Sequence, residues 1–183
     1  MRLTETERLE LLPLDVRLLR LWAEDLPALE QELSCSYQAE PMEGCFLEIV
    51  KGQLAATERD PDHYMWHSFW LLLRKMDRVV VGAADFKNVP DENGEVEIGY
   101  GLGTPFEGSG YMTEAVKAMC AWAEQQEGVR HVIAETERDS LPSQRVLERC
   151  GFRKYDEAST IWWRRQESPH EASGILVPLK MND

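Results

Sequence analysis

Glycines alternate along one stretch of the sequence and recur just after it. Gly99, Gly101 and Gly103 stand two residues apart, so in an extended strand they share one face and leave it bare. Gly108 and Gly110 follow at the start of a helical pattern. Glycines let successive main-chain N–H groups point into one concavity, and a helix N-terminus adds unpaired donors and a partial positive charge. The combination predicts a phosphate or diphosphate site that needs no lysine.

The same glycines have less specific interpretations. A bare strand face also suits a crowded crossing beneath a helix or a β-bulge. Gly108 and Gly110 alone would more often mark a turn than a ligand site. The segment is neither a Walker loop nor a GxGxxG fingerprint, because Thr104 stands near the place of the third glycine and no lysine follows. A nucleotide-phosphate binder of those kinds is therefore disfavoured.

The elements around the glycines alternate between strand and helix. The strand 95–102 carries the glycines on one face and Val96, Ile98, Tyr100 and Leu102 on the other. A long helix from about 109 to 126, a strand 129–136 and a helix 140–150 follow, and Gly151 is a suitable helix stop. This order predicts a β-α-β-α arrangement that holds the glycine turn at the mouth of a helix.

The remaining segments supply helices and an antiparallel meander. Asp15 and Asp25 are suitable helix caps, and Pro27 fits the first turn of the second helix. The other predicted elements are the strands 8–14, 67–74, 79–86, 160–165 and 175–179 and a helix 44–57. We therefore expect an α/β fold in a single domain, residues 1–183. Its central sheet is mixed and mostly antiparallel, has about seven strands and carries helices on both faces.

Composition excludes several classes of protein. Hydrophobic residues make up 43% and charged residues 29%, as in ordinary globular domains, and the net charge is -13. A nucleic-acid partner is not expected, because no basic cluster appears beyond Arg164 and Arg165. Neither a membrane span nor a signal peptide is expected, and four cysteines without CxxC spacing fit a cytoplasmic location. His63 and His67 are the nearest approach to a metal motif, and we expect no metal site.

Two segments together resemble the GNAT superfamily of N-acetyltransferases. The run from Glu97 to Tyr100 and the run from Phe106 to Ala115 are similar to the acetyl-CoA motif of that family. The Pro-Ser-x-x-Val-Leu-Glu-Arg-x-Gly-Phe run up to Phe152 resembles its second cofactor element. Residues 6–11 resemble the opening strand of the branch that acetylates the N-terminal serine or alanine of ribosomal proteins. The resemblance covers nearly the whole chain and implies a GNAT-like sheet.

The resemblance implies a site for acetyl-CoA as co-substrate. Main-chain amides of the glycine turn would hold the diphosphate, and the strand 98–102 would pair with the pantetheine amides while it splays away from the strand that ends at Glu135. The residues implied to bind the cofactor are Ile98, Tyr100, Leu102, Glu107, Gly108, Ser109, Gly110, Tyr111, Met112, Ser140 and Ser143. Ser140 replaces the usual asparagine, and its alternative role is a helix cap.

The implied chemistry is attack of a neutral amine on the thioester carbonyl. The family places an oxyanion donor at the main-chain N–H near Leu102, and its branches place a glutamate base at either of two positions, here Glu97 and Glu135. Two residues depart from the pattern. Glu107 stands where glutamine or arginine is usual, and Leu147 replaces the tyrosine that protonates the departing thiolate. Water or another residue must then supply that proton.

The acceptor is expected to be a primary amine, either a protein N-terminus or a small molecule, and the protein a monomer or a homodimer. An α-amine with a pKa near 7.8 is about one-seventh neutral at pH 7, whereas a lysine is neutral only about once in 2,500 molecules. The alternative is a CoA-binding or interaction module with little turnover. Aromatic residues that could wall an acceptor pocket, although such positions are usually core, are Trp22, Tyr37, Trp66, Trp70, Trp162 and Trp163, together with His67.

Overall fold

The computed structural model describes residues 4–166 of the chain. Within this range, nine strands form one sheet in the order β1-β2-β4-β5-β6-β7-β9-β8, and β3 pairs with β5. Two pairings are parallel, β3 with β5 and β6 with β7, and the others are antiparallel. The predicted mixed and mostly antiparallel α/β sheet is confirmed, and its seven longer strands have five to eight residues each.

The strands are β1 (Thr4–Glu5), β2 (Leu9–Pro13), β3 (Ser36–Tyr37), β4 (Phe69–Arg74), β5 (Val79–Phe86), β6 (Glu95–Leu102), β7 (His131–Glu137), β8 (Phe152–Glu157) and β9 (Thr160–Arg165). The helices are α1 (Val16–Glu24), α2 (Leu26–Leu33), α3 (Gly44–Arg59), α4 (Tyr64–His67), α5 (Tyr111–Ala123) and α6 (Leu141–Arg149). Two short 3-10 helices, η1 (Pro61–His63) and η2 (Thr104–Phe106), complete the described chain.

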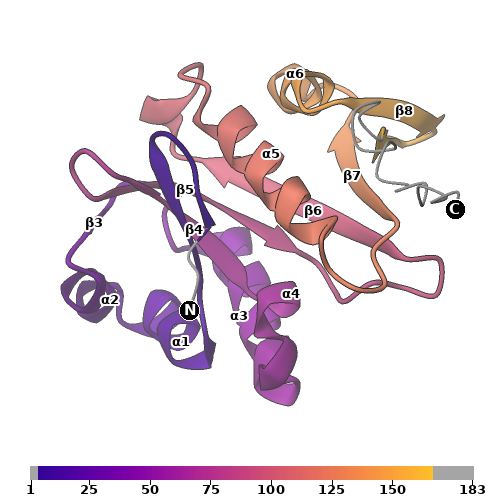
Figure 1. Cartoon of the computed structure of the whole chain (residues 1–183). Helices are drawn as coiled ribbons and strands as arrows, with labels where there is room; N and C mark the ends of the chain where they lie inside the picture. Colours follow the sequence, from indigo (N-terminus) through magenta and orange to yellow (C-terminus); the bar gives the residue numbers. More distant parts are fainter. Residues whose placement is uncertain (1–3, 167–183) are drawn as a thin grey trace, which may run out of the picture.

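Helices cover both faces of the sheet, as expected, and each face has its own hydrophobic core (Figure 1). The first core joins α5 and α6 to one face of the central strands through residues such as Val96, Ile98 and Met119. The second joins α1, α2 and α3 to the opposite face of β4 and β5, around Trp22 and Leu29. Strand β6 packs its apolar face, with Val96 and Ile98, into the first core, whereas its glycine face meets Gln38 and Asp85.

Local sequence signals account for the helix starts in the N-terminal half. The Asp15 carboxylate accepts a hydrogen bond from the Leu18 amide at 2.9 Å, and Asp25 accepts one from Ala28 at 3.2 Å. Pro27 occupies the first turn of α2, as predicted. Each cap satisfies an N–H group that the helix itself leaves unpaired. Both predicted caps are confirmed.

Two strand predictions need correction. Residues 152–157 form β8, which the sequence did not indicate, because this edge strand buries only Phe152 and exposes four charged residues and Tyr155. The hairpin strand expected from residue 67 begins at Phe69, since His67 closes the short helix α4. The strand expected at residues 175–179 lies outside the described residues.

Candidate functional site

Strands β6 and β7 separate partway along their length. They pair in parallel at Glu95, Val96 and Glu97, and the pairing ends there. Strand β6 continues and pairs with β5 on its other edge as far as Leu102. Residues 98–102 therefore present an edge of main-chain groups that β7 does not cover. Such an edge can pair with the amides of an extended ligand.

The glycine turn lies at the start of α5, next to the splayed strands. Gly108 has a φ of +74° and Gly110 a φ of +82°, values that L-residues with side chains rarely adopt. The helix begins at Tyr111, two residues later than expected, and its N-cap Gly110 provides no side-chain cap. Among the described residues, the amides from Gly108 to Met112 have no hydrogen-bond acceptor in the protein. The mouth of α5 thus offers unpaired donors and the positive end of a helix dipole.

An arginine from the N-terminal strand region holds this turn in place. The Arg8 guanidinium donates to the Ser109 carbonyl at 3.0 Å, pairs with Glu114 at 2.8 Å and stacks over the Tyr111 ring at 4.4 Å. The Arg8 amide also donates to Glu114 at 2.8 Å. This role of Arg8 could not be predicted from the sequence, because Arg8 and Ser109 are 101 residues apart.

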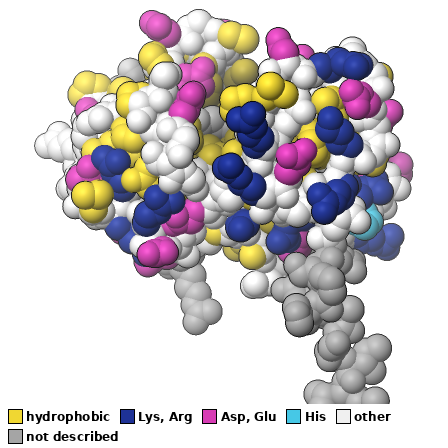
Figure 2. Space-filling model, turned by 90° about the horizontal axis from the view of Figure 1, so that it is seen from above, with side chains coloured by type: hydrophobic (Ala, Val, Ile, Leu, Met, Phe, Trp, Pro, Cys, Tyr) yellow, Lys and Arg dark blue, Asp and Glu magenta, His cyan; other side chains and the backbone are white. Residues whose placement is uncertain are grey.

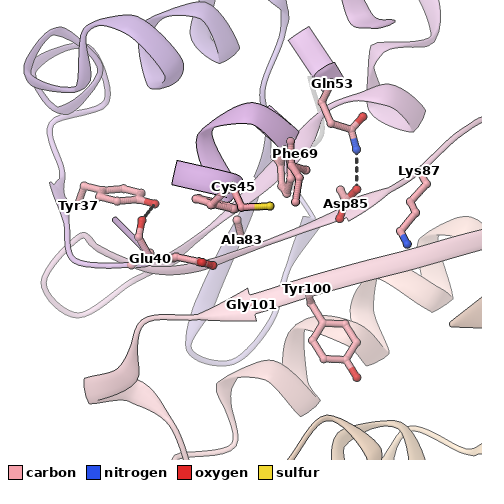
Figure 3. A pocket seen from close by; sticks show the side chains of 13 residues that line it. Tyr37, Glu40, Cys45, Gln53, Phe69, Ala83, Asp85, Lys87, Tyr100 and Gly101 are labelled. Carbon is pink, nitrogen blue, oxygen red and sulfur yellow. Dashed lines mark hydrogen bonds between the residues drawn. The ribbon is translucent and has the colours of Figure 1, made fainter. Parts of the chain in front are cut away.

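Two cavities meet at β6. The α5–α6 cavity has a volume of about 450 Å³ and is lined by Tyr100, Gly101, Leu102, Glu107, Gly108, Gly110, Met112, Thr113, Ser140, Pro142, Ser143, Arg145, Val146 and Arg149. The β5–β6 cavity has a volume of about 530 Å³ and is lined by Tyr37, Ala39, Glu40, Cys45, Phe46, Ile49, Gln53, Phe69, Ala83, Asp85, Lys87, Tyr100 and Gly101 (Figure 3). Tyr100 and Gly101 line both. A ligand bound at the glycine turn could therefore reach a second molecule in the β5–β6 cavity.

The glycine face of β6 packs closely against neighbouring atoms at two positions and borders the β5–β6 cavity at a third. A Cβ at Gly103 would lie 2.5 Å from the Gln38 carbonyl oxygen, and one at Gly99 would lie 2.6 Å from the Asp85 carboxylate. A Cβ at Gly101 would meet only Glu40, at 3.5 Å. Gly99 and Gly103 are therefore required by neighbouring protein atoms, whereas Gly101 borders the open cavity.

Ser140 and Ser143, the residues predicted from the second cofactor element, line the α5–α6 cavity. Ser140 occupies the N-cap position of α6, as the alternative prediction has it, but its side chain makes no capping hydrogen bond. The Ser143 hydroxyl lies 3.2 Å from the Tyr100 hydroxyl, which in turn donates to the Ser143 carbonyl at 3.1 Å. Burial raises the pKa of the Tyr100 hydroxyl, which stays protonated at neutral pH. Leu147, in the position of the family's tyrosine, is fully buried.

Basic side chains add positive charge near the glycine turn. Arg145 and Arg149 on α6 line the same cavity as Gly108 and Gly110. Figure 2 shows that Lys and Arg side chains (dark blue) are interspersed with Asp and Glu side chains (magenta) on the face seen from above. The sequence could have indicated that Arg145 and Arg149 lie side by side on α6, since positions four apart share one helix face. Their charge opposes that of the exposed Glu107 in the same cavity.

A buried carboxylate in the β5–β6 cavity was not predicted from the sequence. Asp85 is 6% exposed and lies opposite Gly99 in the antiparallel ladder of β5 and β6. Its Oδ2 accepts a hydrogen bond from the Gln53 side chain of α3 at 2.7 Å, as Figure 3 shows. Burial raises the pKa of Asp85 to about 6, and the nearby Glu97 adds to the rise while Lys87 opposes it. The cavity thus holds a carboxyl group whose pKa is raised well above its usual value.

The two glutamates considered as bases from the sequence lie outside both cavities as lined above. The Glu97 carboxylate forms an ion pair with Lys87 and its side chain is 20% exposed. Glu135 is exposed on β7 and accepts a hydrogen bond from the Thr160 hydroxyl at 2.5 Å. Glu97 lies on the same face of β6 as Gly99 and Gly101, so it is nearer to the β5–β6 cavity than Glu135 is.

Replacing Asp85 by asparagine should stabilise the fold at alkaline pH. A folded-state pKa near 6 against 3.8 in the unfolded chain means that the folded protein binds the extra proton between these values, so stability falls as pH rises from about 4 to 6. Asparagine avoids this loss and still accepts from Gln53. We expect Asp85→Asn to raise the free energy of unfolding by about 2 kcal/mol at pH 8.

Urea unfolding of both proteins at pH 4, 6 and 8 tests this expectation. The stability difference should be small at pH 4 and largest at pH 8. A variant that is less stable than the parent by the same amount at every pH would show that Asp85 is an ordinary hydrogen-bonding residue.

The predicted aromatic residues mostly belong to the cores. Trp22, Trp66, Trp70 and Trp163 are buried in the two hydrophobic clusters, and only Tyr37 of the named set lines the β5–β6 cavity. No group of three or more potential metal ligands occurs in residues 4–166.

His63 and His67 both hydrogen-bond to one carboxylate, that of Asp60, at 2.9 Å each. They lie in two different short helices, His63 in η1 and His67 in α4. Within the described residues, none of the helices is both long and apolar enough to cross a membrane.

Comparison with known proteins agrees with the geometry. The model of the acetyltransferase (GNAT) domain family matches residues 17–153. The uncharacterized N-acetyltransferase YjdG of Bacillus subtilis is 31% identical over 152 residues, which cover 83% of this chain and 90% of YjdG. The chain belongs to the GNAT acetyltransferase family, and the predicted membership is confirmed. It is therefore an acyltransferase of that family.

Solved structures extend the similarity of the fold. The ribosomal-protein-S5-alanine acetyltransferase of Vibrio fischeri superposes with a TM-score of 0.66 at 18% identity, over 90% of this chain and 96% of that one. RimL, a ribosomal L7/L12 α-N-protein acetyltransferase solved in complex with coenzyme A, gives a TM-score of 0.63 at 16% identity, over 90% and 97% of the two chains. These two ribosomal-protein acetyltransferases thus have the same fold as this chain.

Proposed function

We propose that the protein transfers the acetyl group of acetyl-CoA to a primary amine, either the N-terminus of a protein or peptide or a small molecule. The observation that carries this proposal is the open mouth of α5. Its glycine turn and unpaired amides lie beside strands that splay apart from Ile98 onward. Diphosphates bind well at such helix starts. The complex of the similar protein RimL with coenzyme A supports the same choice of ligand.

In this proposal the cofactor lies along β6. The amides of residues 108–112 hold the diphosphate, and the open edge from Ile98 to Leu102 pairs with the pantetheine. The Glu107 amide, predicted for the same role, donates instead to the Thr104 carbonyl at 3.3 Å. Ser140 and Ser143 border the pantetheine from α6, because both line the same cavity as the turn. The thioester then lies near Tyr100 and Gly101, where the two cavities meet.

The reaction needs a neutral amine and a donor for the developing oxyanion. The main-chain N–H near Leu102 is the proposed oxyanion donor, and binding both substrates at β6 supplies proximity. Glu97 and Glu135 are the bases that family resemblance suggests. Since Leu147 cannot protonate the departing thiolate, water or another residue does so. An α-amine suits such a site better than lysine, because more of it is neutral at pH 7.

The second candidate is a CoA-binding module with little turnover. It is favoured by the buried Leu147 at the position of the family's proton donor and by Glu107 at the phosphate turn. Such a protein would bind acetyl-CoA saturably and leave it intact.

Purified protein incubated with acetyl-CoA and a panel of amines separates the two candidates. The panel contains unblocked peptides, polyamines and aminoglycosides, and free thiol release is followed. The proposal expects thiol release that depends on at least one amine. Saturable binding without release across the panel would establish the binding module, and absence of binding would contradict both.

The two arginines of α6 should strengthen cofactor binding by their charge. Replacing Arg145 and Arg149 together by glutamine removes two exposed cations from the α5–α6 cavity, so we expect acetyl-CoA to bind about 10-fold more weakly. The loss should shrink as salt is raised. The matched control is Arg153→Gln on β8, which lies outside both cavities. Because the control removes one charge and not two, a weakening of about 3-fold by Arg153→Gln would already show that only net charge matters.

A further inference from the structure

The β5–β6 cavity contains a carboxylate with one oxygen open to a ligand. Asp85 Oδ2 is held by Gln53, whereas Oδ1 accepts no hydrogen bond from any residue in the range 4–166. Oδ1 lies on the side of Gly99, where a Cβ would come within 2.6 Å of it. Only glycine at position 99 leaves room for this oxygen. The carboxylate is therefore fixed in orientation by one partner and free to accept a proton on the other side.

The charges around Asp85 favour a positively charged ligand. The groups facing it are Gln53 from α3, Lys87 just after the end of β5 and Glu97 from β6. Lys87 already forms an ion pair with Glu97, so its positive charge is partly neutralised before it acts on Asp85. Glu40 adds a further carboxylate at the cavity wall. Three carboxylates against one ammonium give the region an excess of negative charge, which attracts an ammonium ion.

The other walls of the cavity are mainly apolar. Phe46 and Ile49 from α3, Phe69 from β4 and Ala83 from β5 line it. Tyr37 also lines it, with its hydroxyl turned to the Glu40 carbonyl at 2.6 Å. An apolar wall strengthens the interaction of a bound charge with Asp85, because it lowers the local dielectric constant. The lining thus suits an amine that carries an apolar group next to its nitrogen.

The cavity reaches the proposed position of the thioester. Asp85 is paired with Gly99, two residues before Gly101, and Gly101 borders both cavities. In contrast, the Glu97 carboxylate is occupied by Lys87, and Glu135 is exposed on β7, beyond the splay. Of these three acidic residues, only Asp85 lines a cavity that opens to the proposed position of the thioester.

We propose that Asp85 takes the proton from the acceptor amine as the amine attacks the thioester, in a cavity that selects cationic primary amines with an apolar substituent. This inference rests on the proposed acetyl transfer. Gln53 is a positioning residue, since it acts only by orienting the carboxylate. The raised pKa of Asp85, about 6, suits a base that works near neutral pH.

The step balances without a further reactant. The amine nitrogen forms a bond to the carbonyl carbon, and the carbon–sulfur bond breaks with its electron pair moving to sulfur. An acceptor that arrives as ammonium loses two protons on the way to the amide, and the thiolate takes up one. One proton is released per turnover, and Asp85 passes it to water at the cavity mouth.

The test compares the pH dependence of turnover in the parent and in Asp85→Asn. With saturating acetyl-CoA, an unblocked alanyl peptide and spermidine serve as acceptors with different amine pKa values. The parent should show an acidic limb near pH 6 at the same position for each acceptor that it acetylates. Asp85→Asn should remove this limb and lower kcat about 100-fold or more, while the Kd for acetyl-CoA stays within about 2-fold.

Matched variants distinguish a base from a residue that only binds the amine. Asp85→Glu should recover part of kcat, and Glu97→Gln should keep the acidic limb. The inference is overturned if Asp85→Asn keeps both kcat and the limb, if it raises only KM, or if Glu97→Gln or Glu135→Gln removes the limb instead. If the parent binds no acetyl-CoA or acetylates no amine, the proposed function fails, and this inference fails with it.

Discussion

Gly108→Asp will weaken acetyl-CoA binding by about 100-fold. A Cβ at Gly108 would have no protein atom within 4 Å, so the new side chain would enter the α5–α6 cavity without a clash. Its carboxylate would face the diphosphate at the mouth of α5. At an effective dielectric constant of about 20 and a separation of about 6 Å, two unit charges interact by about 3 kcal/mol, or about 100-fold in affinity. Calorimetric titration with acetyl-CoA measures the effect.

Gly108→Asn is the matched control. Asparagine and aspartate both tolerate the positive φ of +74° better than other side chains and have nearly the same volume. The asparagine variant should therefore bind acetyl-CoA within about 5-fold of the parent. If the two variants weaken binding equally, backbone strain or bulk and not charge is responsible, and the diphosphate does not lie at this turn.

Gly101→Val should abolish acetyl transfer and leave cofactor binding intact. Gly101 lies where the two cavities meet, and a Cβ there would contact only Glu40, at 3.5 Å, so the strand can accept valine. The added methyl groups project toward the β5–β6 cavity and displace the acceptor from the thioester. A misplacement of about 1 Å can cost about 100-fold in rate, so we expect kcat/KM for the amine to fall at least that far.

Gly101→Ala is the control for this second result. It adds only the Cβ, which meets Glu40 at ordinary contact distance, so turnover should stay within about 5-fold. Normal turnover by Gly101→Val would mean that the acceptor does not approach through the β5–β6 cavity. Loss of acetyl-CoA binding by this variant would mean that the glycine face itself holds the cofactor.

The features that local chemistry determines could be predicted from the sequence. The turn at Gly108 and Gly110 requires positive φ values that favour glycine, and the helix caps at Asp15 and Asp25 follow from hydrogen bonds within three residues. The alternation of apolar residues along 95–102 correctly placed Val96 and Ile98 in the core. These signals act over a few residues, so a single sequence contains them in full.

Features that depend on distant partners could not be predicted. Asp85 is the next-to-last residue of the otherwise apolar strand β5. Its environment depends on Gln53, 32 residues away, and on Gly99 across the ladder. Arg8 supports the glycine turn from 101 residues earlier in the chain. Strand β8 lacks an alternating pattern, because an edge strand with one buried residue needs no apolar face. In each case the deciding contact is made by the fold and not by neighbours in sequence.

A crystal structure of the protein with bound coenzyme A tests the central claim most directly. We expect diphosphate oxygens within hydrogen-bonding distance of the amides between Gly108 and Met112, and pantetheine along the edge of β6 from Ile98 to Leu102. The thiol should point toward Gly101. Coenzyme bound elsewhere, with no phosphate at the start of α5, would contradict the account.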